Sequence, residues 1–258
     1  MKRFLLILLA ALLLAPNFID KDINVVLQYD HREQFDPALG YINSIDKLEK
    51  HIDSTIVADS IKPNTVEYVA TITAAIRERF YHGFSHFTLK ENWIAAVAEK
   101  MIGYGLASKV KPDDIMRHPY AACSQQAMVM MEILRRKGLN YRSVGFPHHF
   151  ALEVQVQNQW CYFDPNMEPA ISNNERTEAF WGGKADNLKK YYDTIRFKDL
   201  DWKFGKGLSV THSAVNQRFA KNVKLFQDVT GIASKVLWIF PLLLVFYKRR
   251  RNSPGVNK

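Results

Sequence analysis

The sequence predicts an α+β domain that lies between two apolar ends. Up to about residue 137 the apolar positions recur at helical spacing, and from residue 141 onward they alternate as they do in strands. Helices followed by antiparallel strands are typical of the α+β class. Apolar residues make up 47% of the 258 residues and charged residues 24%, so the chain can build a core and is not of the disordered class.

The first element is an unbroken apolar run over residues 4–15, which follows Lys2 and Arg3. A basic start before a short apolar stretch is the layout of a secretory signal. Pro16 makes the small-residue cleavage pattern poor, so an uncleaved anchor is the alternative. The run is shorter than the about 20 residues that a membrane span needs. We therefore expect residues 1–19 to form a signal peptide or an N-terminal membrane anchor.

Three helices are predicted before the first cysteine. Residues 20–62 form an N-terminal extension with one helix near residues 43–58. The main domain, residues 63–205, begins with a second helix that continues to Phe80, and a third helix covers about residues 92–104. The apolar positions that predict these helices are Ile45, Leu48, Ile52 and Ile56, then Val66, Val69, Ile72 and Ile76, then Trp93, Val97, Met101 and Tyr104.

The clearest helix covers residues 123–137 and ends in three basic residues followed by Gly138, which is typical of a helix end. Its core positions are Met128, Met131, Leu134 and, as an alternative, Met130. The N-terminus of a helix carries partial positive charge that stabilises a thiolate at Cys123, and its free N–H groups can bind a developing oxyanion. Position alone still favours a buried structural cysteine.

Three strands follow this helix, over residues 141–146, 149–156 and 160–163. The chain beyond Pro169 is polar and irregular, and one more helix is indicated around residues 188–195. The order of helices first and antiparallel strands afterwards completes the prediction of an α+β domain.

His149 and Asp164 fall on neighbouring predicted strands, and the register of this hairpin decides whether their side chains meet. A two-residue loop at residues 158–159 pairs Asp164 with Glu153, which is too far from His149. A four-residue loop pairs Asp164 with Ala151 instead and makes it the diagonal neighbour of His149, about 7–8 Å away between backbones. The sequence permits the second geometry without requiring it.

Five short segments resemble the core of the transglutaminase-like superfamily. They are Cys-Ser-Gln-Gln-Ala at 123–127, Leu-Arg-Arg-Lys-Gly-Leu at 134–139, Arg-Ser-Val-Gly at 142–145, His-Phe-Ala-Leu-Glu-Val at 149–154 and Trp-Cys-Tyr-Phe-Asp-Pro at 160–165. In that family the cysteine opens a helix, the histidine begins a strand, and the aspartate closes the partner strand. The resemblance covers roughly residues 63–170, and the combination of motifs is far more specific than any one of them.

The resemblance implies a papain-like fold in which the cysteine helix packs on an antiparallel sheet. It implies that Cys123 is the nucleophile, that His149 is the general base and acid, and that Asp164 orients the imidazole. The expected reaction is acyl transfer through a thioester on amide bonds of proteins or peptides, with hydrolysis favoured over crosslinking. No metal or organic cofactor is implied. A catalytically idle scaffold or binding module of the cell envelope is the alternative.

Two features depart from the family pattern. Ala122 stands before the cysteine, where many members carry a glycine close by, and the interval from Cys123 to His149 is compact. Neither feature removes a catalytic group, but with both of them the route by which a substrate reaches the cysteine is not defined by the resemblance. Trp93 or a glutamine near the cysteine is a candidate second donor to the oxyanion.

The remaining candidates have structural interpretations. His148 beside His149 suggests a metal, but adjacent strand residues point to opposite faces and further ligands at usual spacings are lacking. Cys161 is expected to be a buried inert thiol, and a disulfide with Cys123 is the alternative. Glu153 is expected to form an ion pair on the face of its strand.

The formal net charge of +9 is concentrated near the ends of the sequence. Residues 2–3 and 248–258 contain seven basic residues and no acidic one, which leaves +2 for the residues between them. A nearly neutral middle with basic ends indicates membrane topology rather than binding of nucleic acid. We expect protein or peptide substrates and the membrane as partners, and no nucleic acid.

A second apolar run lies near the C-terminus. After a linker or helix at residues 206–230, residues 231–247 form a predicted transmembrane segment and residues 248–258 a basic cytoplasmic tail. An apolar helix packed on the domain is the alternative. By the positive-inside rule both ends lie in the cytoplasm, so the domain is expected outside it, in the periplasm or at the cell surface.

Overall fold

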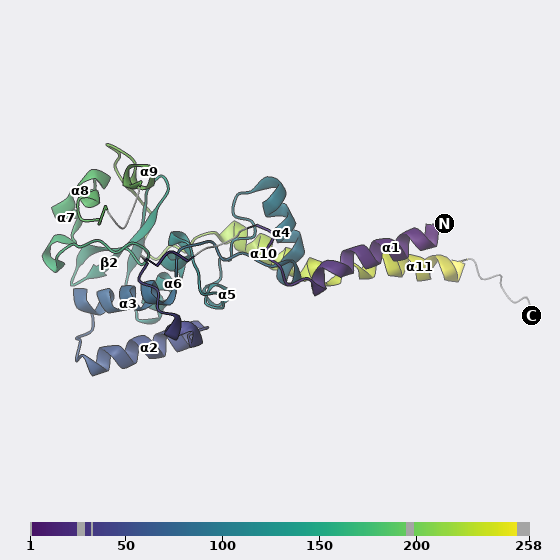
Figure 1. Ribbon diagram of the computed structural model, residues 1–258, viewed down its shortest axis with the longest axis horizontal. Helices are drawn as coiled ribbons and strands as arrows, with labels where there is room; N and C mark the ends of the chain where they lie inside the picture. Colours follow the sequence, from purple (N-terminus) through teal and green to yellow (C-terminus); the bar gives the residue numbers. More distant parts are fainter. Residues whose placement is uncertain (1, 25–28, 32, 195–198, 252–258) are drawn as a thin grey trace, which may run out of the picture. The chain divides into compact units, whose positions relative to one another are not determined.

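The computed structural model describes residues 2–24, 29–31, 33–194 and 199–251. The chain divides into two compact units, each assembled from separate stretches of sequence (Figure 1). The helical unit comprises residues 1–26, 86–108 and 220–258, and the sheet unit comprises residues 27–85 and 109–219.

These units do not coincide with the expected boundaries at residues 20–62 and 63–205. Most of the expected N-terminal extension belongs to the sheet unit. Residues 86–108, which lie in the middle of the expected domain, belong instead to the helical unit with the two ends of the chain. Part of the expected helix at 188–195 lies outside the described residues, and the described part of that region forms only the short helix α8 at Ala185–Lys189.

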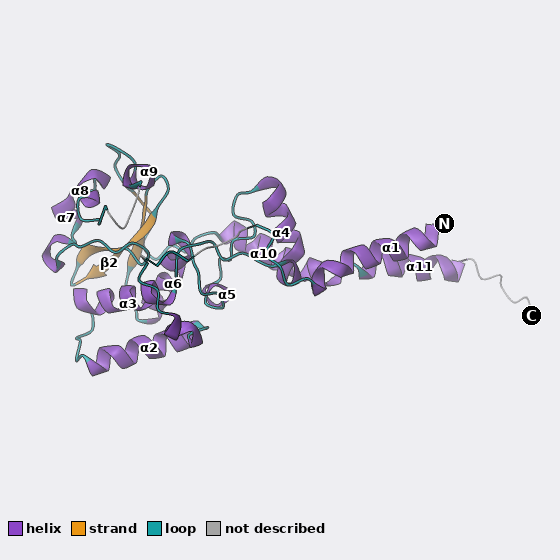
Figure 2. Ribbon diagram, in the orientation of Figure 1, coloured by secondary structure: helices purple, strands orange, loops and turns teal. Residues whose placement is uncertain are grey.

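The sheet unit is a mixture of helices and one antiparallel sheet, which confirms the predicted α+β class (Figure 2). The four strands are ordered β3-β2-β1-β4. Their bounds are β1 Tyr141–Gly145, β2 Phe150–Val156, β3 Gln159–Phe163 and β4 Thr211–His212.

Strand β4 was not predicted, because it is two residues long and lies in the expected linker. It pairs with Val144 and Gly145 of β1. A Cβ atom at Gly145 would lie 2.7 Å from the hydroxyl of Thr211, so a glycine is needed for the close approach of this strand.

The hairpin of β2 and β3 has the register that places Asp164 opposite Ala151. Its last pair is Val156 with Gln159, so the turn is only Gln157-Asn158, and both residues have positive φ, 48° and 68°. Positive φ at both central positions is typical of a type I′ turn. The expected loop lengths and positions were therefore wrong, while the register needed for a contact between His149 and Asp164 is present.

Three long helices build one side of this unit, namely α2 Ile45–Ala58, α3 Val66–Arg79 and α6 Cys123–Arg136 (Figure 1). Helices α3 and α6 pack on the sheet, and α2 packs on these two helices. Ser44 and Thr65 cap α2 and α3 by accepting hydrogen bonds from backbone N–H groups in the first turn. The apolar stripes predicted for these helices form the core, although Met128 is only half-buried. Helix α6 packs on α3 and directly on β2, so the helix that begins at Cys123 lies against the sheet.

A second core lies on the other face of the sheet, where Val144, Ala151 and Tyr162 pack against Trp181 and Phe204. Short helices supply this layer, namely α7 Glu178–Trp181, α8 and α9 Leu200–Phe204. The remaining helices of the sheet unit are η2 Pro37–Tyr41, α5 Pro112–Ile115 and η3 Asn173–Glu175.

The helical unit contains α1 Lys2–Leu14, η1 Ala15–Phe18, α4 Leu89–Ile102, α10 Lys221–Val236 and α11 Ile239–Arg251. Helix α1 packs along α11, and α4 packs on both α10 and η1. Within the described residues, none of the helices alone has the length and apolar character to cross a membrane. Helix α10 and residues 239–247 pass that test only as a pair, which is bent by 46°.

Candidate active site

Cys123 is the first residue of α6, and the local structure is held by the buried side chain of Gln125. Its Oε1 accepts hydrogen bonds from the N–H groups of Ala122 (3.2 Å) and Ser85 (2.9 Å), and its Nε2 donates to the carbonyls of Ser85 (2.9 Å) and Lys109 (2.8 Å). The glutamine thereby fixes the turn that precedes the helix. The thiol of Cys123 is half-buried and not in a disulfide.

The start of α6 provides backbone donors beside this thiol. The first helical hydrogen bond runs from Gln126 N to Ala122 O at 2.9 Å. The N–H groups of Cys123, Ser124 and Gln125 therefore have no acceptor within the helix, as in the first turn of every helix. The helix dipole adds partial positive charge at the same place.

His149 and Asp164 form a buried pair. Their Nε2 and Oδ2 atoms are 2.5 Å apart, and the residues are 4% and 0% exposed. His149 directly precedes β2, and Asp164 directly follows β3, so the hairpin register brings them together. Because Nε2 faces the carboxylate, Nδ1 is the ring nitrogen left for Cys123, whose side chain interacts with the imidazole.

The carboxylate of Asp164 accepts four hydrogen bonds. Oδ1 accepts from the N–H groups of Asn166 (3.0 Å) and Met167 (2.9 Å), and Oδ2 accepts from His149 and from the hydroxyl of Tyr192 (2.8 Å). This set fixes both oxygens and leaves one ring orientation for the histidine. Such satisfaction is required of a carboxylate that is fully removed from water.

The electrostatics of the pair favour the charged forms of both residues. Burial opposes the ionised carboxylate, but the charge and hydrogen bond of His149, with the donors Met167 N–H and Tyr192 OH, lower the pKa of Asp164 below its usual value. Burial likewise opposes the imidazolium, but Asp164 and Cys123 raise the pKa of His149 to about 9. The histidine is therefore protonated at neutral pH and can neutralise a thiolate.

Tyr192 falls in the region where a helix was expected at residues 188–195, and its contact with Asp164 was not predicted. Its hydroxyl lies 2.8 Å from that of Tyr162, and both tyrosines are buried. Burial raises the pKa of each well above the usual value, so the hydroxyls stay protonated and able to donate. No sequence pattern could reveal this contact, because Tyr192 reaches the site from a turn after α8.

A further ion pair holds the residues around Asp164. The backbone N–H of Asp164 donates to the Glu168 carboxylate (2.8 Å), and this carboxylate pairs with Arg176 at 2.6 Å. Arg176 also donates to the carbonyl of Tyr162 at 3.0 Å. These contacts fix the end of β3 and hence the position of the carboxylate.

His148 and His149 point in different directions, as expected for neighbours in extended chain. The ring of His148 is exposed and stacks on Trp202, with the ring centroids 4.0 Å apart. The ring of His149 packs against both Phe146 and Phe204, which also contact each other. His148 therefore lies outside the buried pair.

His82 is a site neighbour that the sequence did not indicate. Its ring is hydrogen-bonded to the side chain of Asn166 and interacts electrostatically with His149. The residue is exposed, unlike His149. This places a polar ring next to the buried pair, and burial lowers the pKa of that ring to about 4.

The candidate second oxyanion donors have other hydrogen-bond partners in the structure. Both hydrogens of the Gln125 amide are donated to backbone carbonyls, and the amide of Gln126 donates to Ala121 O at 2.9 Å. Trp93 belongs to the helical unit, where its indole donates to Ser234 O at 3.1 Å. The backbone N–H groups at the start of α6 remain as the candidate donors.

Cys161 lies in the core beneath the sheet, is 3% exposed and is not in a disulfide. Burial raises the pKa of its thiol, which disfavours the reactive thiolate. The two cysteines thus occupy different environments, one at a helix start beside a histidine and one in an apolar core.

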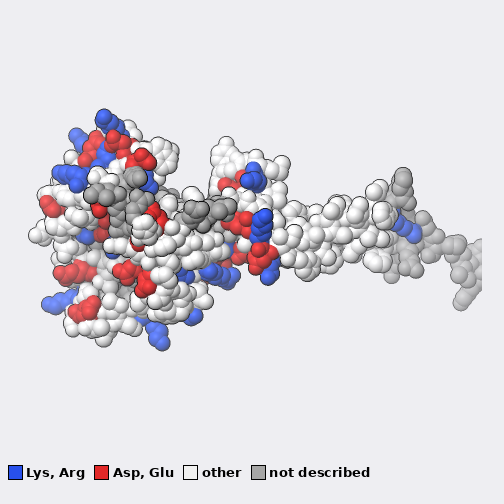
Figure 3. All heavy atoms as spheres, viewed as in Figure 1, with Lys and Arg blue, Asp and Glu red and all other residues white. Residues whose placement is uncertain are grey.

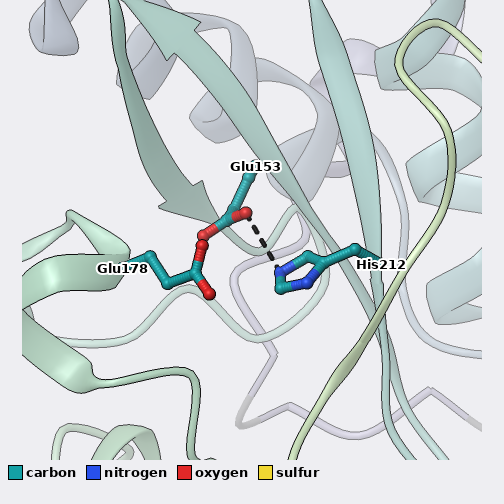
Figure 4. A group of neighbouring side chains, drawn as sticks. All are labelled: Glu153, Glu178 and His212. Carbon is teal, nitrogen blue, oxygen red and sulfur yellow. Dashed lines mark ion pairs between the residues drawn. The ribbon is translucent and has the colours of Figure 1, made fainter.

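Glu153, Glu178 and His212 form a separate group whose ligand atoms lie within 4.8 Å of one another (Figure 4). The guanidinium of Arg142 contacts both carboxylates, at 2.6 Å for Glu153 and 2.5 Å for Glu178. This cation already supplies the positive charge that a metal would bring. We interpret the group as an ion-pair network that ties β1 and β2 to α7, in line with the ion pair expected of Glu153.

No family model, curated protein or solved structure matches this chain. Its activity must therefore be inferred from the arrangement of the residues themselves.

Proposed function

We propose that the sheet unit is a transglutaminase-like cysteine enzyme with a papain-like catalytic core. It would act on amide bonds of proteins or peptides through a thioester, with hydrolysis favoured over crosslinking. The observation that carries this proposal is the buried contact of 2.5 Å between His149 and Asp164, next to a thiol at a helix start. Nucleophile, base and orienting acid in hydrogen-bonding sequence are the requirement for nucleophilic catalysis of this kind.

The acylation step begins with the thiol at the helix start and the protonated histidine beside it. The Cys123 thiolate attacks the amide carbonyl, and the new C–S bond places negative charge on the carbonyl oxygen. The free N–H groups at the start of α6 stabilise that charge. The imidazolium of His149 gives its proton to the leaving nitrogen, the C–N bond breaks, and an amine leaves.

The second step returns the enzyme to its starting state. Water attacks the thioester while His149, now neutral, takes a proton from it. The C–S bond breaks, a carboxylic acid leaves, and the thiolate and imidazolium are restored. An amine in place of water would give a crosslinked product instead.

We further propose that the chain is tethered to a membrane with the sheet unit on the extracytoplasmic side. The apolar segments at residues 4–15 and 231–247 and the basic clusters beside them support this topology. The bent pair of α10 and α11 and the apolar surface of α1 are compatible with an anchor made of more than one helix.

A thiol-labelling experiment on the full-length protein tests the enzyme. We expect iodoacetamide to label Cys123 selectively well below pH 8, because only that thiol has a helix start and an imidazolium beside it. Wild type should release products from cell-envelope peptides, detected by mass spectrometry, and Cys123→Ala should release none. Cys161→Ala is the matched control and should retain activity. Equal, slow labelling of both thiols would instead favour a catalytically idle scaffold.

A further inference from the structure

The contact between α4 and α10 in the helical unit is made by polar residues. Asn92 Nδ2 donates to Thr230 Oγ1 at 3.0 Å and to Gln227 O at 3.2 Å, and the Trp93 indole donates to Ser234 O at 3.1 Å. Asn92 is 1% exposed, and the three α10 residues are 4%, 8% and 0% exposed for Gln227, Thr230 and Ser234. The helices therefore meet through buried amide and hydroxyl groups.

A small residue and a further amide complete this contact. A Cβ at Gly231 would lie 3.7 Å from the Asn92 amide, an ordinary van der Waals distance, so Gly231 faces α4 without being needed for the approach of the two helices. Asn17 in η1 donates to Ser234 O at 2.9 Å. Interhelical hydrogen bonds from polar side chains such as Asn are characteristic of helix packing within lipid.

The opposite face of α10 is apolar and exposed. Leu225, Val229, Ile232 and Val236 follow one another at i, i+4, i+7 and i+11 and so share a single face. Their exposed fractions are 65%, 58%, 69% and 48%. A helix that packs in water would turn this face inward, whereas α10 turns its polar face inward.

The C-terminal end of α4 continues this apolar character. Met101, Ile102 and Tyr104 are 79%, 63% and 87% exposed, although Met101 and Tyr104 were predicted to share a face with the buried part of the helix. Two exposed large apolar side chains at the end of α4 and an exposed tyrosine just after it are unfavourable in water. A tyrosine at such a position is suited to the interface of a bilayer.

The apolar surface also extends over α1 and α11. Phe4, Leu5, Leu8 and Leu12 on α1 and Phe240, Leu243, Phe246 and Tyr247 on α11 are exposed. In Figure 3 the spheres over α1 and α11 are almost entirely white, whereas charged atoms lie over the region of α4 and α10 as they do over the sheet unit. The face of α10 is thus continuous along the chain with the segment proposed to anchor the protein.

The positions of the charged residues of α10 limit how far the helix could enter a lipid bilayer. Lys224 and Asp228 form an ion pair at 2.7 Å, and Lys235 donates to Asn17 Oδ1 at 3.0 Å. These residues lie on a flank of α10, beside the apolar face rather than within it. An apolar face with charges along its flank is typical of a helix that lies in the headgroup region with its apolar side toward the acyl chains.

We infer that the outward face of α10 and the end of α4 contact lipid, so that residues 86–108 are a membrane-binding insertion within the proposed enzyme. The inference rests on the proposed membrane tether and extends it to a segment that hydropathy alone does not select. Its occupant is a lipid bilayer, because only a lipid environment reconciles a polar helix contact with an apolar exterior on the same helix.

Site-specific fluorescence in lipid vesicles tests this inference on the full-length chain. The background carries Cys123→Ser and Cys161→Ser, and single cysteines are introduced by Met101→Cys, Val229→Cys, Leu8→Cys or Val57→Cys. Each is labelled with an environment-sensitive fluorophore and reconstituted in vesicles of phosphatidylethanolamine and phosphatidylglycerol, with or without nitroxide-bearing acyl chains. Val57 is the matched control, since it is an apolar side chain, 78% exposed, on α2 of the sheet unit.

We expect the nitroxide lipids to quench labels at 101, 229 and 8 several-fold more than the label at 57. Quenching at 8 without quenching at 101 and 229 would overturn the inference and leave the tether in place. Loss of quenching at all four positions would overturn both. An unquenched label at 229 that transfers energy to labels on other chains would assign the face to a second copy of the protein instead of lipid.

Discussion

The two units of this chain bury different kinds of polar group. In the sheet unit, the buried polar groups next to the second core are ionisable and coupled, as His149, Asp164 and Glu153 are. Where α4 meets α10, they are neutral amides and hydroxyls. Buried charges are costly and shift pKa values, which suits chemistry, whereas neutral hydrogen bonds join helices at little electrostatic cost.

The exteriors differ in the same sense. The sheet unit surrounds apolar cores with charged surface, and the helical unit presents apolar residues outward. The sheet unit therefore follows the rule for proteins in water, and the helical unit has the arrangement that the proposed contact with lipid requires. Each prediction below is expected to affect one unit and to leave the other unchanged.

Replacing the orienting acid should have the largest effect. In Asp164→Asn the carboxylate that stabilises the imidazolium is lost, so we expect peptide hydrolysis to fall by roughly 10³–10⁴-fold. The pKa of His149 should drop from about 9, because its raised value depends on Asp164. The alkaline limb of the rate against pH should therefore move to lower pH, as measured by steady-state kinetics on the full-length protein.

Membrane association provides the control for that variant. Asp164→Asn should sediment with vesicles as wild type does, because the change lies in the sheet unit. An unchanged rate and an unchanged alkaline limb would show that Asp164 does not act on His149, and would remove the basis of the catalytic proposal.

Matched isoleucines measure the contrast between the two units directly. Ile52 in α2 is fully buried, and Ile232 in α10 is 69% exposed. Ile52→Ala should lower the free energy of unfolding by about 2–5 kcal/mol, because it leaves a cavity in a packed core. Ile232→Ala should change it by less than about 0.5 kcal/mol, measured by denaturant unfolding in detergent.

In an assay of binding to vesicles, a change at position 232 should have a larger effect than a change at position 52. Ile232→Asp should reduce binding to vesicles, because a carboxylate would enter the acyl region. If Ile52→Ala and Ile232→Ala destabilised the protein equally, the outward face of α10 would have to be a packed surface, and the contrast between the units would disappear.

The helices could be predicted from the sequence, whereas the contacts between residues far apart in the sequence could not. Helices α2, α3 and α6 were predicted from the spacing of residues such as Leu48, Ile72 and Leu134, since periodicity is a local property. The register of the β2–β3 hairpin depended on whether Gln157 and Asn158 adopt positive φ, which neither residue requires. The contact of His149 with Asp164 was therefore permitted by the sequence and decided by a turn.

Partners from distant segments lay beyond such reasoning. Tyr192 reaches Asp164 from a turn, and the hydroxyl of Thr230 reaches Asn92 across 138 residues of sequence. The apolar spacing of Trp93, Val97 and Met101 predicted a helix correctly but gave no sign that its end would be exposed. Periodicity reports that a face is apolar, and it does not report whether protein or lipid covers that face.

Tyr192→Phe tests whether the Tyr192 hydroxyl, which donates to Asp164, positions the proposed catalytic pair. We expect a reduction of kcat by about tenfold or less, since one of four hydrogen bonds to the carboxylate is lost. With one donor fewer, the carboxylate attracts the imidazolium more strongly, so the pKa of His149 should rise. The alkaline limb should move to higher pH, opposite to its movement in Asp164→Asn.

The direction of that shift separates positioning from mere packing. A purely structural role of Tyr192 would lower the melting temperature without moving the alkaline limb. Tyr162→Phe is the matched control, because its hydroxyl contacts Tyr192 and is not among the donors to Asp164. It should leave the limb close to that of wild type.

The effect of Glu153→Gln should appear only as a change of stability with pH. Burial raises the pKa of Glu153 to about 7, more than the pair with Arg142 lowers it, while in the unfolded chain the usual value near 4.5 applies. As pH rises from about 4.5 to 7, the unfolded chain loses this proton before the folded one does, so the folded state loses stability. The difference in stability between Glu153→Gln and wild type should therefore shift in favour of the variant across that window, by up to about 3 kcal/mol. Thermal unfolding of both proteins at pH 5 and pH 8 measures the shift, and a difference that does not change with pH would mean that Arg142 keeps Glu153 ionised throughout.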